Sequence, residues 1–172
     1  WSSSLLALLL FAVVASTTAP YSSSASNETT SLVKELVGLG KLRLKAFNDY
    51  YLTSEMGLFP PFQVPTLSLF GWRPDDVIQR YHFEQINENE VALRQAKRRE
   101  VERYVSHSHF DWAMMADEAK EWEMLTPVKN ADGSWSFKSR WNKWLSAHRG
   151  MGGIVEFMPE NLRCEHWRLE SA

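Results

Sequence analysis

The 172-residue sequence has very little cysteine: Cys164 is the only one, so an intrachain disulfide is impossible. Small secreted domains usually carry several disulfides, and this lack favours a reducing compartment. A strong charge of either sign is also missing, because the formal net charge is -2. Such a balance gives no global attraction to nucleic acid, and we expect no nucleic-acid partner.

Catalytic signatures are scarce as well. The sequence contains no Gly-x-Ser-x-Gly nucleophile motif, and the glycines of residues 150–153 lack the spacing of a phosphate loop. Nothing in the pattern pairs histidines for a haem or brings two carboxylates together. No internal repeat is apparent either. We therefore expect a protein that is not an enzyme and that carries no cofactor.

Charge is absent from the first 27 residues, and residues 5–15 form an unbroken apolar run. A helix over the first 19 residues would be about 28 Å long, close to the thickness of a bilayer core. We interpret residues 1–20 as a membrane-anchor helix. The alternative is a signal peptide, because the apolar run is short and small residues follow it, although no basic segment precedes it.

The rest of the chain divides by composition. Residues 21–31 are rich in Ser and Thr and are expected to form a linker, and residues 32–172 are expected to form a helical region outside the membrane. Lys34, Lys41 and Arg43 follow the apolar segment closely. By the positive-inside rule, these residues place the C-terminal region in the cytoplasm, or in the matrix or stroma of an organelle. For a mitochondrial inner membrane, this is the matrix side.

Residues 57–74 are an apolar stretch with four prolines, which forbid a regular helix and disfavour a central strand. We expect an extended arm that lies along a partner or the membrane boundary; the alternative is an arm that folds over the protein's own helices. Eight Trp residues in so short a chain also indicate contact with partners. The arm's expected contact residues are Leu58, Phe59, Phe62, Leu67, Leu69, Phe70 and Trp72.

Helical spacing of apolar residues predicts helices over residues 32–51, 110–125 and 141–148, and a charged helix over 88–103. Residues 130–133 predict a hairpin turn, and residues 154–158 a short strand. The predicted fold class is mainly α: one N-terminal transmembrane helix, an extended Pro-rich arm, several amphipathic helices and a small β-hairpin.

Two groups of residues are candidates for binding. Lys97, Arg98 and Arg99 form a basic cluster that favours phosphate or anionic lipid, although a solvated helix face explains it too. His107, His109 and Asp111 resemble the His-x-His-x-Asp-His zinc signature of the metallo-β-lactamase fold, with Trp112 in place of the last His.

A structural zinc site is a further alternative. Cys164 and His166 are separated by one residue, and His148 is the nearest other histidine. Thiolate and imidazole both suit zinc, but a structural site needs four ligands. We therefore expect no resident metal here.

In its layout, the chain resembles the single-span supernumerary subunits of mitochondrial respiratory-chain complexes or of ATP synthase. That resemblance implies a non-catalytic accessory subunit of the mitochondrial inner membrane. Its partners would be the other subunits of the complex and membrane lipid. The alternatives are a secreted or soluble binding protein with a signal peptide, a zinc-dependent hydrolase using His107, His109 and Asp111, and a peripheral protein on anionic lipid.

Overall fold

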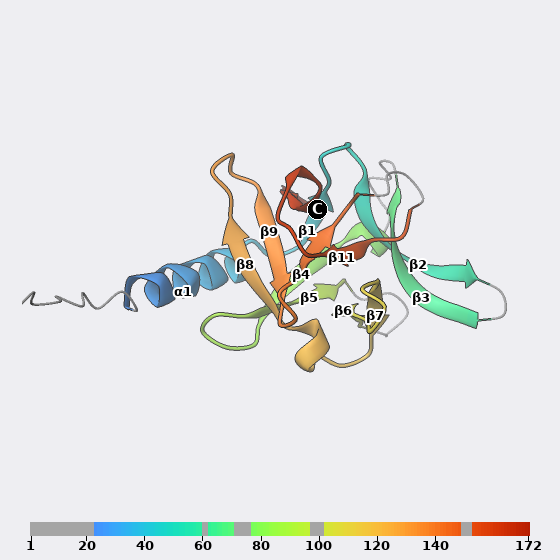
Figure 1. Cartoon of the computed structure of the whole chain (residues 1–172), viewed down its shortest axis with the longest axis horizontal. Coiled ribbons are helices and arrows are strands. Elements are labelled where there is room, and N and C mark those ends of the chain that lie inside the picture. Colours follow the sequence, from blue (N-terminus) through green and yellow to red (C-terminus); the bar gives the residue numbers. More distant parts are fainter. Residues whose placement is uncertain (1–22, 60–61, 71–76, 97–101, 149–152) are drawn as a thin grey trace, which may run out of the picture.

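The computed structural model describes residues 23–59, 62–70, 77–96, 102–148 and 153–172 (Figure 1). These residues form one α-helix, twelve strands and three short 3₁₀ helices. The helices are α1 (Ser23–Gly38), η1 (Val77–Gln79), η2 (Glu121–Glu123) and η3 (Arg163–Glu165). The strands are β1 (Leu42–Lys45), β2 (Tyr51–Phe59), β3 (Phe62–Phe70), β4 (Tyr81–Gln85), β5 (Val91–Gln95), β6 (Tyr104–His107), β7 (Ala113–Ala116), β8 (Leu125–Lys129), β9 (Trp135–Ser139), β10 (Trp144–Ser146), β11 (Glu156–Met158) and β12 (Arg168–Ser171).

Six strands close into a barrel in the order β1, β4, β5, β8, β9 and β12. Antiparallel pairing joins β1 to β4, β4 to β5, β5 to β8, β8 to β9, and β12 back to β1. The remaining gap, between β9 and β12, is closed by Trp135 and Trp167. Each of these residues donates its backbone N–H to the other's carbonyl oxygen at 2.8 Å. Closure leaves the barrel strands without a free edge.

The barrel is built from one contact repeated three times. The first residues of β1, β5 and β9 each pair with a residue at the start of the next barrel strand along the chain. These next strands are β4, β8 and β12, respectively. All six side chains are buried, so the repeated contact forms a ring of the core. The three pairs are Leu42–Tyr81, Val91–Leu125 and Trp135–Trp167. The fold therefore has an internal threefold repeat, which we did not detect in the sequence.

The connections repeat as well. A 3₁₀ helix precedes each of β4, β8 and β12. The turns after β4 and β8 have equal length and the same closing bond: Ile86 N–H donates to the carbonyl of Glu90 (3.0 Å), and Asn130 N–H to that of Ser134 (2.9 Å). Positions in different repeats can therefore be compared one by one.

Three hairpins form a second layer: β2–β3, β6–β7 and β10–β11. Backbone hydrogen bonds join them, from Ala113 N–H to Val155 O (2.8 Å) and from Val155 N–H to Leu67 O (2.9 Å). Strands β3 and β7 also pair directly. In Figure 1, β2, β3, β6 and β7 lie on the side of the barrel away from α1. These hairpins therefore cap the barrel.

Helix α1 packs against β4 and β8. Val33 and Leu36 are fully buried in the same core as the barrel side chains. Lys129 of β8 donates to Glu35 Oε1 at 2.6 Å, which ties the exposed side of the helix to the barrel. The helix is therefore part of the folded domain.

The mainly α prediction is wrong. Of the helix expected over 32–51, only 32–38 is helical, and β1 follows; residues 88–103 contain β5, residues 110–125 contain β7, and residues 141–148 contain β10. The alternation of buried and less buried residues that marks a strand extends over only four or five residues here, as with Leu42 and Leu44 in β1. Such short runs also fit helical spacing. The hairpin turn at 130–133 and a strand within 154–158 are confirmed.

The expected arm is instead largely the β2–β3 hairpin, with nine residues in each strand. Leu67 and Leu69 are fully buried in the protein's own core, so they are not a partner surface. The structure does not describe the side chains of Leu58, Phe59, Phe62 and Phe70. Residues 60–61 and 71–74, including Trp72, lie outside the described residues.

The expected anchor, residues 1–20, also lies outside the described residues, as do Lys97, Arg98 and Arg99. Residues 23–31, within the expected linker, belong to α1. Among the described helices, none is both long and apolar enough to cross a bilayer.

Replacing Leu36 with Ala tests the packing of α1. Because Leu36 is fully buried, the loss should lower the free energy of unfolding by about 2–5 kcal/mol. The matched control is Leu39→Ala, since Leu39 is 46% exposed, and it should cost about 0.5 kcal/mol or less. Urea unfolding followed by Trp fluorescence measures both. Equal effects of the two substitutions would contradict the packing.

Candidate ligand-binding site

Two tryptophans form a stacked pair at the protein surface. Trp122 comes from η2 and Trp141 from the turn between β9 and β10; their ring centres are 3.7 Å apart and their planes differ by 17°. His109, from the β6–β7 turn, packs edge-on against Trp122 at 4.3 Å. Trp141 stays 38% exposed. The pair therefore presents an aromatic surface to a ligand.

His107 lies beneath this pair and is almost fully buried. Its ring stacks on Phe157 at 4.2 Å. Its Nδ1 lies 2.9 Å from Ser139 Oγ, and its Nε2 lies 2.9 Å from Asp111 Oδ1. Burial lowers the pKa of His107, so the imidazole is neutral at pH 7. One nitrogen thus holds His107 to Ser139, and the other fixes the turn that carries Asp111.

Asp111 contacts both His107, beneath the aromatic pair, and Lys143. The Lys143 ammonium contacts Asp111 Oδ2 in an ion pair. This hydrogen bond is the main reason that the pKa of Asp111 lies below its ordinary value. Asp111 and Asn142 have positive φ values of 62° and 63°, which Asp and Asn tolerate better than most residues. The two turns therefore bring the Asp111 carboxylate to the Lys143 ammonium, and Asn142 and Lys143 directly follow Trp141 in the sequence.

A groove runs beside Trp122. Polar side chains line it together with the indole, and several of them are already in ion pairs: Glu118 with Lys120 at 2.7 Å, and Asp117 with Arg103 at 3.2 Å. Its lining residues are Ala116, Asp117, Glu118, Lys120, Trp122 and Glu123. An exposed aromatic face beside hydrogen-bonding side chains suits a ligand that is apolar on one face and rich in hydroxyls at its edge.

Two further exposed aromatic side chains lie in the β6–β7 turn, which also carries His109. Phe110 is 76% exposed and Trp112 is 39% exposed, and their rings lie 5.9 Å apart. Trp112 N–H donates to Ser108 Oγ at 3.1 Å, which fixes the turn. Exposed aromatic side chains in such numbers are typical of a binding surface.

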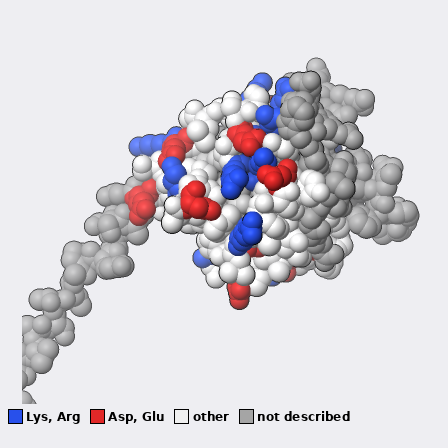
Figure 2. Space-filling view, turned by 90° about the horizontal axis from the view of Figure 1, so that it is seen from above, with Lys and Arg blue, Asp and Glu red and all other residues white. Residues whose placement is uncertain are grey.

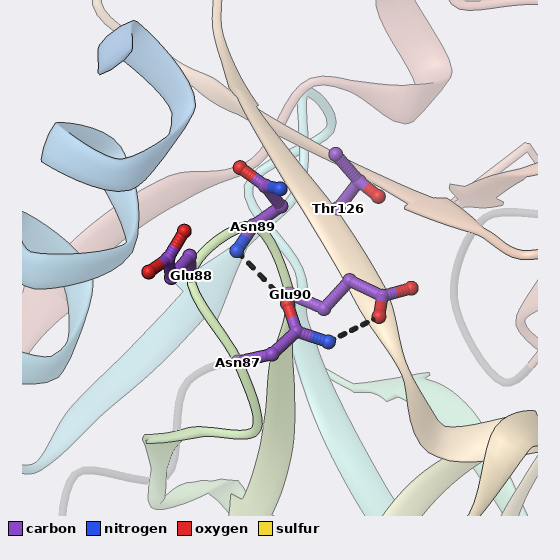
Figure 3. Close-up of a pocket in the computed structure, with 5 residues that line it drawn as sticks. All are labelled: Asn87, Glu88, Asn89, Glu90 and Thr126. Carbon is purple, nitrogen blue, oxygen red and sulfur yellow. Dashed lines mark hydrogen bonds between the residues drawn. The ribbon is translucent and has the colours of Figure 1, made fainter. Parts of the chain in front are cut away.

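A second hollow lies at the turn between β4 and β5 (Figure 3). Asn87 and Glu90 point toward each other, and Asn87 Nδ2 donates to Glu90 Oε2 at 2.6 Å. Arg140 lies 3.6 Å from Glu90 and 3.7 Å from Glu121, so this arginine pairs with two acids beside the hollow. The broader surface seen in Figure 2 likewise mixes acidic and basic side chains.

The structure brings the predicted zinc candidates into one turn, but not as a ligand set. Ser139 and Asp111 occupy both nitrogens of His107, and His109 lies against Trp122. In the described part of the chain, no three His, Cys, Asp or Glu side chains are grouped as metal ligands.

The other predicted zinc candidates are separated by their own contacts. His148 Nε2 lies 3.3 Å from Glu156 and His166 Nδ1 lies 3.5 Å from Asp132. Burial raises the pKa of the Cys164 thiol, which disfavours the thiolate that binds metal. The sequence reasoning missed Trp122 and Trp141 as site residues, and the high Trp content was the only signal that could have found them.

No protein-family model and no curated protein matches the sequence. Solved structures do match over 77% of the chain, at 12–14% identity. They include the designed threefold-symmetric protein ThreeFoil (13%, TM-score 0.63, 99% of its chain), SeviL bound to asialo-GM1 saccharide (14%, 0.60, 98%) and the Polyporus squamosus lectin bound to a sialylated epitope (12%, 0.63, 49%). The chain also spans 17% of a mosquitocidal holotoxin (13%, 0.64). At such identities these matches show the fold, a β-trefoil.

These findings overturn the functional expectation. The β-trefoil fold, which the chain shares with solved lectins, contradicts an accessory subunit in the mitochondrial inner membrane, and with it the expected membrane-complex and membrane-lipid partners. The expected alternative of a binding protein fits better. The resemblance to supernumerary subunits depended on chain layout and finds no counterpart among the comparisons.

The ion pair between Asp111 and Lys143 gives a test. Lys143→Met should raise the pKa of Asp111 toward 3.8, because the hydrogen bond from Lys143 is the largest cause of its lowering. NMR titration of the Asp111 side-chain carboxyl carbon measures the shift. Lys138→Met is the control, since Lys138 lies over the Trp144 ring. An unchanged Asp111 pKa in Lys143→Met would contradict the described geometry.

The same pair predicts how stability depends on pH. A folded-state pKa below the unfolded-state value means that ionised Asp111 stabilises the fold at neutral pH, and that this contribution is lost as the pH falls through the folded-state pKa. Below a pH of about 4, the original protein should therefore lose more stability than Lys143→Met does.

Proposed function

We propose that this chain binds carbohydrate at the Trp122–Trp141 pair and catalyses no reaction itself. The observation that carries the proposal is the exposed, stacked indole pair with polar side chains at its edge. A pyranose ring has an apolar C–H face and a rim of hydroxyls. An indole face suits the first, and carboxylate, amide and ammonium groups suit the second.

The comparisons support this class of ligand. SeviL was solved with the asialo-GM1 saccharide, and the Polyporus squamosus lectin with Neu5Acα2-6Galβ1-4GlcNAc. Fold likeness alone does not carry function, because one fold hosts many activities. The proposal therefore depends on the site, whose aromatic and polar groups lie on turns that a rigid barrel holds in place.

The charges at the site support binding without catalysis. One similar structure is an endo-β-galactosidase, and the match covers 31% of that enzyme's chain. Glycosidases need a carboxylic acid whose pKa is raised, so that it can donate a proton. Here Lys143 lowers the pKa of Asp111, and Lys120 lowers that of Glu118. Both groups are ionised at neutral pH and suit hydrogen bonds to hydroxyls.

The proposal predicts binding of neutral oligosaccharides. A glycan array with the original protein identifies the preferred structure, and Galβ1-4GlcNAc serves as the first soluble probe. Isothermal titration calorimetry then compares variants. Trp141→Ala should weaken binding about tenfold or more, because it removes the exposed aromatic face.

The control for this experiment is Leu162→Ala, which deletes another exposed apolar side chain, on the residue just before η3. It should bind as the original protein does. Two results would contradict the proposal: no oligosaccharide on the array is bound, or Trp141→Ala binds with unchanged affinity.

A further inference from the structure

A small hollow lies between the β8–β9 turn, η3, β12 and the β1–β2 turn. Its cavity volume is about 70 Å³. This space suits a few heavy atoms, because a single water occupies about 30 Å³. The hollow is therefore too small for a sugar ring. The residues that line it are Phe47, Asp132, Ser134, Arg163, His166 and Arg168.

This hollow is related by the internal repeat to the one in Figure 3. Both lie beside a turn of the same length that leads into the next barrel strand. Glu123 of η2 and Glu165 of η3 correspond: each accepts a backbone N–H from three residues earlier, at 2.7 and 2.8 Å. The β1–β2 turn, which contains Phe47, corresponds to the β9–β10 turn, which contains Arg140. Each of these turns has a residue with φ near 65°, Asp49 and Asn142 respectively. The two hollows can thus be compared position by position.

The comparison shows that the two hollows differ in their charged residues. Glu90, which lines the first hollow, corresponds to Ser134 in the second. Glu121 and Arg140 lie beside the first hollow, where Arg140 pairs with both Glu90 and Glu121, and they correspond to Arg163 and Phe47. The second hollow therefore keeps one acid, Asp132, at the position of Glu88, and it has two arginines, Arg163 and Arg168, where the first has none in its lining.

The arginines of the second hollow remain without a carboxylate partner. Within the described residues, neither Arg163 nor Arg168 forms an ion pair, and the Arg163 guanidinium lies over the Phe47 ring at 5.5 Å. The one acid present, Asp132, is already occupied. It accepts the N–H of Ser134 at 3.0 Å and the hydroxyl of Ser134 at 2.5 Å, and lies 3.5 Å from His166.

We propose that this hollow binds a small oxyanion group, namely a sulfate or phosphate, through Arg163 and Arg168. Guanidinium groups match such anions with paired, charge-assisted hydrogen bonds. The group is either a free ion or a substituent on a saccharide. This inference does not depend on carbohydrate binding at the Trp122–Trp141 pair.

Calorimetry with sodium sulfate at constant ionic strength tests the proposal. Arg163→Gln and Arg168→Gln should each weaken sulfate binding about tenfold or more, because each removes a charge-assisted contact. Asp132→Asn should tighten it several-fold, an effect that general destabilisation cannot produce. The matched control is Lys34→Gln, which removes an exposed positive charge on α1 and should leave binding unchanged. Thermal unfolding confirms that each variant is folded.

The two sites can fail separately. Trp141→Ala should retain sulfate binding, and Arg163→Gln should retain any binding of neutral Galβ1-4GlcNAc. Galactose 6-sulfate distinguishes the sources of the anion: binding tighter than that of inorganic sulfate assigns the group to a saccharide, and equal binding assigns it to a free ion. Absence of saturable sulfate binding, or sulfate affinity unchanged in both arginine variants, would overturn this inference.

Discussion

The structure depends on the closure of six short strands into a barrel. Strands of four or five residues are unstable alone, and their backbone groups are satisfied only when each strand has two neighbours. The reciprocal hydrogen bonds between Trp135 and Trp167 close the ring, and the indole of Trp167 donates to Leu145 O at 3.0 Å, which ties the barrel to the cap. The position of every surface turn follows from this closure.

The barrel explains how one scaffold carries different chemistry at related positions. Core positions in the three repeats share burial and apolar character, as Leu42, Val91 and Trp135 do. The turns carry no such constraint, because their side chains face solvent. One turn between β9 and β10 therefore presents Trp141, while the corresponding turn between β1 and β2 presents Asn48. Binding chemistry can vary there without loss of the fold.

The sequence predicted the local turn chemistry better than the architecture. The turn at 130–133 was predictable because Asp132-Gly133 favours a hairpin, and Gly133 has a φ of +81°. The strands were missed because Ala113 and Met115 alternate over only four residues, while Trp112, Met115 and Trp122 also match helical spacing. The repeat was hidden because its equivalent residues share burial and neither size nor identity, as the pairs Leu42–Tyr81, Val91–Leu125 and Trp135–Trp167 show. The Trp122–Trp141 pair requires contacts between distant segments that no local pattern contains.

The most direct test of this account follows the indole N–H signals of the protein by NMR during titration with an oligosaccharide that the glycan array selects. The sequence has eight Trp residues, and two of them, Trp122 and Trp141, report on the proposed carbohydrate site. The account predicts that the signals of Trp122 and Trp141 shift in a saturable way, while that of Trp167, buried and bonded to Leu145 O, stays in place. Saturable shifts that spare Trp122 and Trp141 would contradict it.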